Sequence, residues 1–150
     1  MSDAELYERD FFTWTQRQAA RLRREATRRA NSDVDFDNIA EEIESLGRSQ
    51  MRALTSSYRL IAMHLLKLIY QPERKSESWI ETIRRERSNI EDEMDDSPGL
   101  KAKRRGLFAR AYRRARRDAA FETGMAIETF PEKPPFSLDQ IERHDWLPSA

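Results

Sequence analysis

Apolar residues recur three and four positions apart along nearly the whole chain, which is the spacing of one face of an α-helix. The first row follows Ser2 and Glu5, which fit a capping box at a helix start. Its members are Tyr7, Phe11, Trp14, Gln18 and Leu22. We therefore predict a helix over about 3–29 whose mainly apolar row faces a partner helix.

The longest predicted helix covers about 37–70, and Asp37 is its expected N-cap. Gly47 lies inside it, and a glycine in a helical pattern marks a kink or a close contact. From Tyr58 onward apolar residues occur nearly all round the helix. This segment is therefore expected to lie at the centre of a bundle, contacted from several sides.

Two further helix starts follow Pro72. Ser78 and Glu81 fit a second capping box and predict a helix over about 78–95. Ser97 and Pro98 give the N-cap and first-turn signals of a helix over about 98–124.

Gly124 is the expected end of the last long helix, and residues 125–150 form a proline-rich tail. Phe130, Phe136 and Trp146 are candidates to pin this tail across the bundle, with one short turn beginning at Ser137. Strand-like alternation is absent from the sequence. We predict an all-α fold, an antiparallel four-helix bundle with a long central second helix, built as a single domain over residues 1–150.

The composition of the chain argues against several classes of protein. Lys plus Arg and Asp plus Glu number 27 each, so the net charge is zero while the charges are segregated along the chain. The chain has no cysteine, which excludes disulfides and thiolate chemistry. Residues 1–10 lack the features of a secretory signal, and the apolar stretch 58–70 is shorter than a membrane span. We expect a cytoplasmic protein with no membrane partner.

Several longer strings resemble a bacterial family known as domain of unknown function twenty-nine. They are LYERDFFTWTQRQAARLR from Leu6, DFDNIAEEIESLGRS from Asp35, HLLKLIYQPERKSESW from His64, DSPGL from Asp96, AYRRARRDAAFETG from Ala111 and FPEKPPF from Phe130. The resemblance implies a compact, one-domain helical protein of bacteria such as cyanobacteria and proteobacteria, and it implies no activity. Many members carry Cys-Pro-Tyr where this chain has Pro134, Pro135 and Phe136, so no role of that thiol or phenol carries over.

Polar residues also occur at positions where the helical pattern expects apolar ones. A buried network is predicted from Gln50, Ser57, His64, Arg87 and Glu122. A buried ion needs a partner, so Arg87 is expected to meet Glu42 or Glu122. The same groups allow an enzyme, with His64 as general base or ligand and Glu42, Asp118 or Glu122 as acidic partners. A network that only fixes helix register is the favoured interpretation.

Signals for cofactors and metals are missing. The two histidines, His64 and His144, fit neither a di-iron nor a zinc-hydrolase pattern, and the four glycines are too scattered to cradle a phosphate. We therefore predict no metal and no cofactor.

Residues 101–117 contain nine basic residues and no acidic one. The part expected to stay free is Arg110, Arg113, Arg114 and Arg117, because the acidic residues 91–96 should fold back beside residues 101–105. The face lacks the interleaved aromatic residues of single-strand binders, and a solvated face is the simplest interpretation.

Three functions remain, in order of preference. The first is a non-enzymatic interaction module whose basic helix face or aromatic tail binds another protein. That protein is either an unidentified partner or a second copy of the chain, which would make a homodimer. The second is a nucleic-acid-associated protein that uses Arg110, Arg113, Arg114 and Arg117. The third is an enzyme built on His64 and the inward carboxylates.

Overall fold

The computed structural model describes residues 1–149, which form six α-helices and three short 3₁₀ helices without a strand. The all-α class predicted from the periodicity is therefore confirmed. The chain groups into two compact units. Unit 1 comprises Met1–Arg52 with Glu93–Ala102, and unit 2 comprises Ala53–Asp92 with Lys103–Ala150. The four-helix bundle and the single domain stay predictions.

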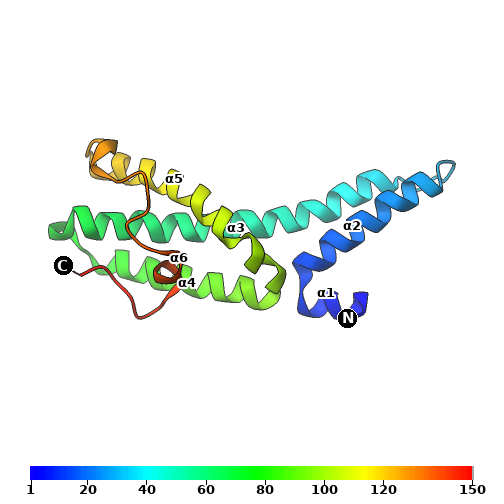
Figure 1. The fold of residues 1–150 in the computed structure, drawn as a ribbon, viewed down its shortest axis with the longest axis horizontal. Coiled ribbons are helices and arrows are strands. Elements are labelled where there is room, and N and C mark those ends of the chain that lie inside the picture. Colours follow the sequence, from blue (N-terminus) through cyan, green and yellow to red (C-terminus); the bar gives the residue numbers. More distant parts are fainter. Residues whose placement is uncertain (150) are drawn as a thin grey trace. The chain divides into compact units, whose positions relative to one another are not determined.

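Unit 1 begins with two helices where one was predicted, α1 (Asp3–Arg9) and α2 (Phe11–Arg28). The capping box of Ser2 and Glu5 is confirmed. Asp10 ends α1 and caps α2, because its carboxylate accepts a hydrogen bond from the amide of Thr13 at 3.2 Å. Figure 1 shows α2 running back beside the first part of α3 (Phe36–Tyr70).

The buried face of the first segment differs from the predicted row. The buried residues are Leu6, Phe12, Thr15 and Ala19. Tyr7 is 51% exposed, and its ring packs edge-on against Phe11 and Trp14 with centroid distances of 5.7 and 5.0 Å. The other members of the predicted row, Phe11, Trp14, Gln18 and Leu22, are half-buried, so the row lies at the edge of the buried face rather than at its centre.

The N-cap of α3 lies two residues before the predicted one, and the helix begins at Phe36. Asp35, rather than Asp37, acts as the cap, since its carboxylate accepts a hydrogen bond from the amide of Asn38 at 3.2 Å. The helix then continues through Gly47 without interruption. A Cβ at Gly47 would lie 2.8 Å from the hydroxyl oxygen of Thr15, so the glycine permits close packing of α2 on α3.

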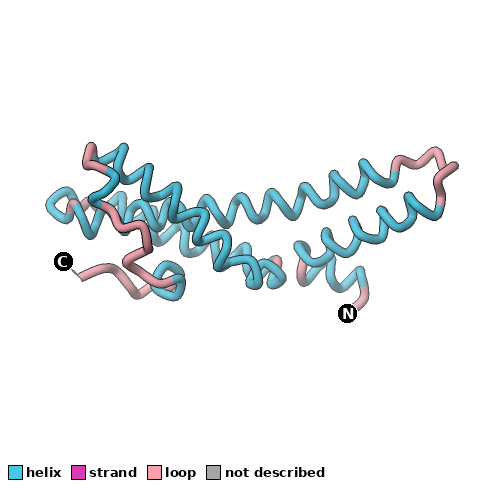
Figure 2. Tube along the Cα trace, turned by 45° about the horizontal axis from the view of Figure 1, so that its top comes forward, coloured by secondary structure: helices cyan, strands magenta, loops and turns pink. Residues whose placement is uncertain are grey.

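Unit 2 contains the rest of α3, most of α4 (Glu77–Asp96), α5 (Arg104–Thr123) and α6 (Leu138–Glu142). Two short 3₁₀ helices, η1 (Pro72–Arg74) and η3 (Ile127–Thr129), also lie in unit 2, whereas η2 (Pro98–Lys103) lies in unit 1 except for its last residue. Figure 2 shows the loops that join these elements. The core of the unit includes Leu54, Tyr58, Ile61, Leu65, Ile83, Ile90, Phe108, Tyr112, Phe130 and Ile141.

Both later helical segments begin within one residue of the predicted positions, but their predicted start signals act differently. The α4 helix begins at Glu77, and the hydroxyl of Ser78 contacts that of Ser76 at 2.8 Å. Ser97 precedes the 3₁₀ helix η2, while α5 itself begins at Arg104. The hydroxyl of Ser97 serves long-range contacts, because it accepts the amide of Phe12 at 3.0 Å and donates to Gln50 at 3.1 Å.

The end of the chain folds onto unit 2. Gly124 ends α5 in the left-handed conformation with φ of 72°, as predicted, and Ser137 begins α6 with a capping box. Phe130 and Phe136 are buried, and Trp146 is half-buried. The tail aromatics are therefore largely enclosed by unit 2. Among residues 1–149, no helix is both long and apolar enough to cross a bilayer.

Candidate interaction surface

Arg87 is the largest fully buried polar side chain of unit 2, with 2% of its surface exposed. Its guanidinium donates hydrogen bonds to the backbone carbonyls of Ile141 at 2.8 Å and Gln140 at 3.0 Å, and more weakly to that of His144 at 3.5 Å. Burial lowers the pKa of Arg87 to about 10, which leaves it protonated at neutral pH. The cation thus holds the carbonyl end of α6, where a positive charge suits the helix dipole.

The contact predicted between Arg87 and Glu42 or Glu122 is therefore wrong. A buried cation does need acceptors, and here three backbone oxygens fill that need in place of a carboxylate. These hydrogen bonds fasten the C-terminal segment to α4.

The other members of the predicted network have separate partners. Gln50 belongs to unit 1 and accepts from Ser97. Ser57 donates to the carboxylate of Glu86 at 2.8 Å in unit 2. Glu86 is buried and went unnoticed in the sequence, because it lies on a charged helix among residues of similar type. The residues predicted as one network are therefore not one connected group.

His64 lies in a small cluster with Lys67 and Trp79. Its Nδ1 bonds the carbonyl oxygen of Leu60 at 2.8 Å, so that nitrogen carries the proton and Nε2 is the basic atom. The Lys67 ammonium lies 4.4 Å from the centre of the Trp79 ring and 2.7 Å from a carboxylate oxygen of Glu122. Burial, chiefly, lowers the pKa of His64, so the ring is neutral at pH 7.

The other acidic groups of the predicted catalytic set are placed elsewhere. The Asp118 carboxylate pairs with Arg59 at 2.8 Å, and Glu42 lies in unit 1. Glu122 is near His64 but is held by Lys67. Within the described residues, no group of three or more His, Cys, Asp and Glu side chains is placed to hold a metal ion.

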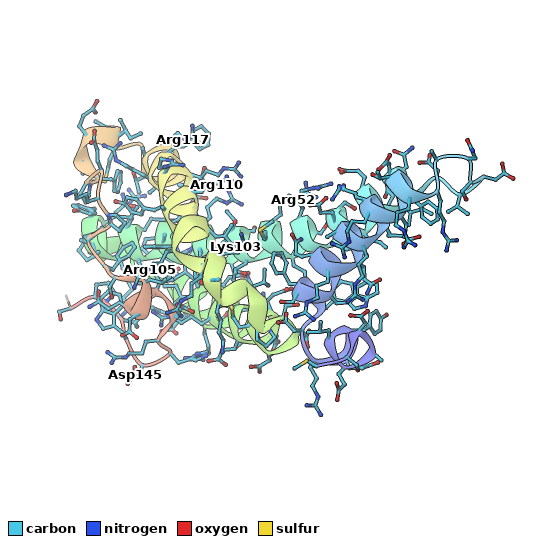
Figure 3. The ribbon with its side chains drawn as sticks, turned by 45° about the vertical axis from the view of Figure 1, so that its right-hand side comes forward. Arg52, Lys103, Arg105, Arg110, Arg117 and Asp145 are labelled. Atoms are coloured by element: carbon cyan, nitrogen blue, oxygen red, sulfur yellow. The ribbon has the colours of Figure 1, made fainter. Side chains whose placement is uncertain are left out.

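The basic face predicted on the last long helix lies on α5. Arg110, Arg113, Arg114 and Arg117 are all exposed, and their spacing of three and four places them on one side of the helix. Figure 3 shows Arg110 and Arg117 extending from the same side of α5. Within residues 1–149 none of the four forms an ion pair. We call these four residues the arginine face.

The basic residues at the start of the last long helix were predicted to pair with the acidic residues of 91–96. The structure shows other ion pairs there. Arg104 pairs with Glu142 of α6 at 3.1 Å, and Glu91 pairs with His144 at 2.7 Å. Both contacts again involve the C-terminal segment, whose path the sequence pattern did not predict.

Phe121 is the residue of this surface that sequence reasoning missed. It is 90% exposed, more than any other large apolar side chain described. It follows Arg117 by four residues and Arg114 by seven, so it lies in line with the arginine face. That spacing was visible in the sequence, and it would have identified an aromatic residue on the polar side of the helix.

A hollow of about 470 Å³ lies beside the arginine face. Its lining includes Arg113, Arg116 and Arg117 of α5, with Ile127 of η3 and Glu132. The Arg116 Nε donates to the carbonyl of Phe130 at 2.8 Å, which holds that side chain in place. The surface therefore combines fixed and free guanidinium groups with an exposed ring.

Comparisons with known proteins place the chain in a family. No curated protein matches it. It is similar to an alpha-helical protein of unknown function from Rhodospirillum rubrum, whose crystal structure was solved at 1.45 Å resolution. The identity is 29%, the match covers 93% of this chain and 90% of that chain, and the TM-score is 0.71. Residues 6–147 match the family described as "Domain of unknown function DUF29", and the chain therefore belongs to that family.

Proposed function

We propose that the chain is a protein-interaction module whose binding surface is the arginine face together with Phe121. The observation that carries this proposal is the 90% exposure of Phe121 at the end of a row of unpaired arginines. An aromatic ring in water loses the stabilisation that burial would give it, about 1.5–3 kcal/mol for a side chain of this type. A partner that covers the ring recovers that free energy.

The composition of the surface supports a protein partner. Protein interfaces are enriched in aromatic residues and arginine and depleted in lysine, and the residues that dominate binding come largely from the enriched types. The arginine face and Phe121 contain arginine and phenylalanine alone. The partner surface should present carboxylates beside an apolar recess that accepts the ring.

A second candidate is single-stranded nucleic acid, and Phe121 is also the observation that favours it. A basic row that ends in an exposed ring can follow a phosphate backbone while one base stacks on the ring. The case is weaker because one aromatic residue at the end of the row provides one stacking site, whereas single-strand binders stack successive bases.

One titration compares the two functions. The full chain is titrated into a labelled peptide that carries glutamates and leucines three and four residues apart, so that both lie on one face of a helix. In parallel it is titrated into labelled single- and double-stranded DNA and RNA. Fluorescence anisotropy is followed at low and near-physiological salt. The variants are Phe121→Ala and the fourfold replacement of Arg110, Arg113, Arg114 and Arg117 by Glu.

A matched variant controls for net charge. It replaces four other exposed arginines by Glu, namely Arg9, Arg17, Arg24 and Arg84. We expect the peptide to bind the wild-type chain and the matched variant, and to bind each α5 variant at least about tenfold more weakly, equal to 1.4 kcal/mol. Failure of the peptide to bind, or equal binding by the α5 variants, would reject the proposed function. Tighter binding of nucleic acid, with a steep salt dependence lost in the fourfold variant, would establish the second candidate instead.

A further inference from the structure

Unit 1 has an apolar helix face of its own at the start of α3. Ile39 is 42% exposed and Leu46 is 47% exposed, although both occur at core-like spacing in the sequence. With Ile43 they line a shallow, wide-open hollow of about 410 Å³ along one face of the start of α3. The remaining lining residues are Asp35, Asn38, Glu42 and Ser45. We call this surface the α3 hollow.

The charge of the α3 hollow is opposite to that of the arginine face. Its two ionisable lining residues, Asp35 and Glu42, are acidic, and among residues 1–149 no basic residue lines it. Asp35 is engaged at the helix start by Asn38, while Glu42 forms no ion pair within residues 1–149. The hollow therefore presents an unpaired carboxylate beside exposed aliphatic side chains.

These properties are those required of the surface that covers Phe121. We propose that the chain associates with a second copy of itself, with Phe121 of one copy seated in the α3 hollow of the other. Arg114 and Arg117 flank the ring and face the carboxylates of the hollow. This inference rests on the proposed function, since it names the protein that the arginine face binds.

The overall charge of the chain is compatible with this association. Lys plus Arg equal Asp plus Glu at 27, so two copies approach without net repulsion. Proteins near zero net charge associate more readily than strongly charged ones. The segregation of the charges then selects which surfaces meet, because a basic face attracts an acidic one and repels its own copy.

The proposed contact between Phe121 and the α3 hollow buries little surface, so the association should be weak. An aromatic side chain buries about 150–250 Å² when it is enclosed, whereas stable protein interfaces bury at least about 1,000 Å² in total. We therefore expect self-association that depends on concentration and weakens when salt screens the charges. A tight, permanent dimer is not expected.

Sedimentation velocity of the full chain tests the proposal between about 1 μM and about 1 mM. The weight-average sedimentation coefficient should rise with concentration for the wild-type chain. It should stay at the monomer value for Phe121→Ala and for Leu46→Glu. Val34→Ala is the matched control, because Val34 is 48% exposed and belongs to neither surface, and it should associate like the wild type.

Mixing the two non-associating variants gives the sharpest test. The Leu46→Glu copy retains an intact Phe121, and the Phe121→Ala copy retains an intact hollow. An equimolar mixture should therefore associate more strongly than either variant alone. Charge reversal gives a second readout. Arg117→Glu and Glu42→Arg should each weaken association when present alone, and association should return when both substitutions are present. Circular dichroism checks that each variant is folded.

The results separate this inference from the function on which it rests. A wild-type chain that stays monomeric while the acidic peptide binds the arginine face would overturn self-association and leave the proposed function standing. Association that survives both Phe121→Ala and Leu46→Glu would overturn it as well. Loss of peptide binding and of self-association together in the wild-type chain would remove both.

Discussion

The Nε atom of Arg87 donates a hydrogen bond to the backbone carbonyl of Ile141 at 2.8 Å, across 54 residues of sequence. Through this hydrogen bond and two others, to Gln140 and His144, one buried cation on α4 holds α6 and the residues just after it.

Replacing Arg87 by Met should lower the free energy of unfolding by about 2–4 kcal/mol, because buried carbonyls lose charge-assisted hydrogen bonds. Urea unfolding measures the change. Arg84→Met is the control, since Arg84 is exposed on the same helix and should change stability little. Residues 137–149 should also become more sensitive to limited proteolysis in Arg87→Met. An unchanged digestion pattern would contradict the fastening role.

Two glycines inside helices should respond oppositely to alanine. Gly47→Ala should destabilise the chain, because the new Cβ would lie 2.8 Å from the Thr15 hydroxyl oxygen. Gly106→Ala meets nothing within 4 Å, and it should raise the free energy of unfolding by up to about 1 kcal/mol through helix propensity. Thermal unfolding of both variants checks the pair, and equal shifts would argue against close packing at Gly47.

Two buried tyrosines should respond oppositely to phenylalanine. Among the described residues the hydroxyl of Tyr58 is buried without a hydrogen-bond partner, and burial raises its pKa. Tyr58→Phe removes that unsatisfied group and should stabilise the chain by about 1 kcal/mol. Tyr112 donates to the carbonyl of Pro131, so Tyr112→Phe should destabilise it by a similar amount. Urea unfolding compares the two, and a Tyr58→Phe variant less stable than wild type would show that the hydroxyl has a partner.

His64 should make the stability depend on pH. Burial lowers its pKa in the folded chain below the ordinary 6.5, so the unfolded chain takes up a proton first as pH falls. The free energy of unfolding should therefore fall from pH 7 downward, until the folded-state pKa is passed. The wild type should lose stability relative to His64→Gln between about pH 7 and pH 5.

The helices could be predicted because their evidence is local. Periodic apolar residues located every long helix, and the capping box at Ser2 and the helix end at Gly124 are confirmed, whereas the caps predicted for α3 and α4 are not. The break at Asp10 was also signalled locally, by an acceptor three residues before Thr13. It was missed because the aromatic row appeared to continue across it.

The polar contacts could not be predicted because they join distant segments. The carbonyl oxygens that bind Arg87 are positioned by α6. The Phe12 amide, which donates a hydrogen bond to the Ser97 hydroxyl, is positioned by the break at Asp10. Periodicity gives the face of a helix but not the path of the chain that covers it. Phe121 differs, since its place in line with Arg117 follows from spacing alone.

The hydrogen bond from the Phe12 amide to the Ser97 hydroxyl has a consequence for synthesis on the ribosome. The two residues are 85 apart in sequence, and translation at about 5–20 residues per second takes about 4–17 s to cover that distance. During that interval the start of α2 has emerged while the hydroxyl that satisfies it has not yet been made. The pair formed by α2 and the first part of α3 thus gains this hydrogen bond only after more than half of the chain has been made. A chain truncated before Ser97 contains the same helices but lacks the bond.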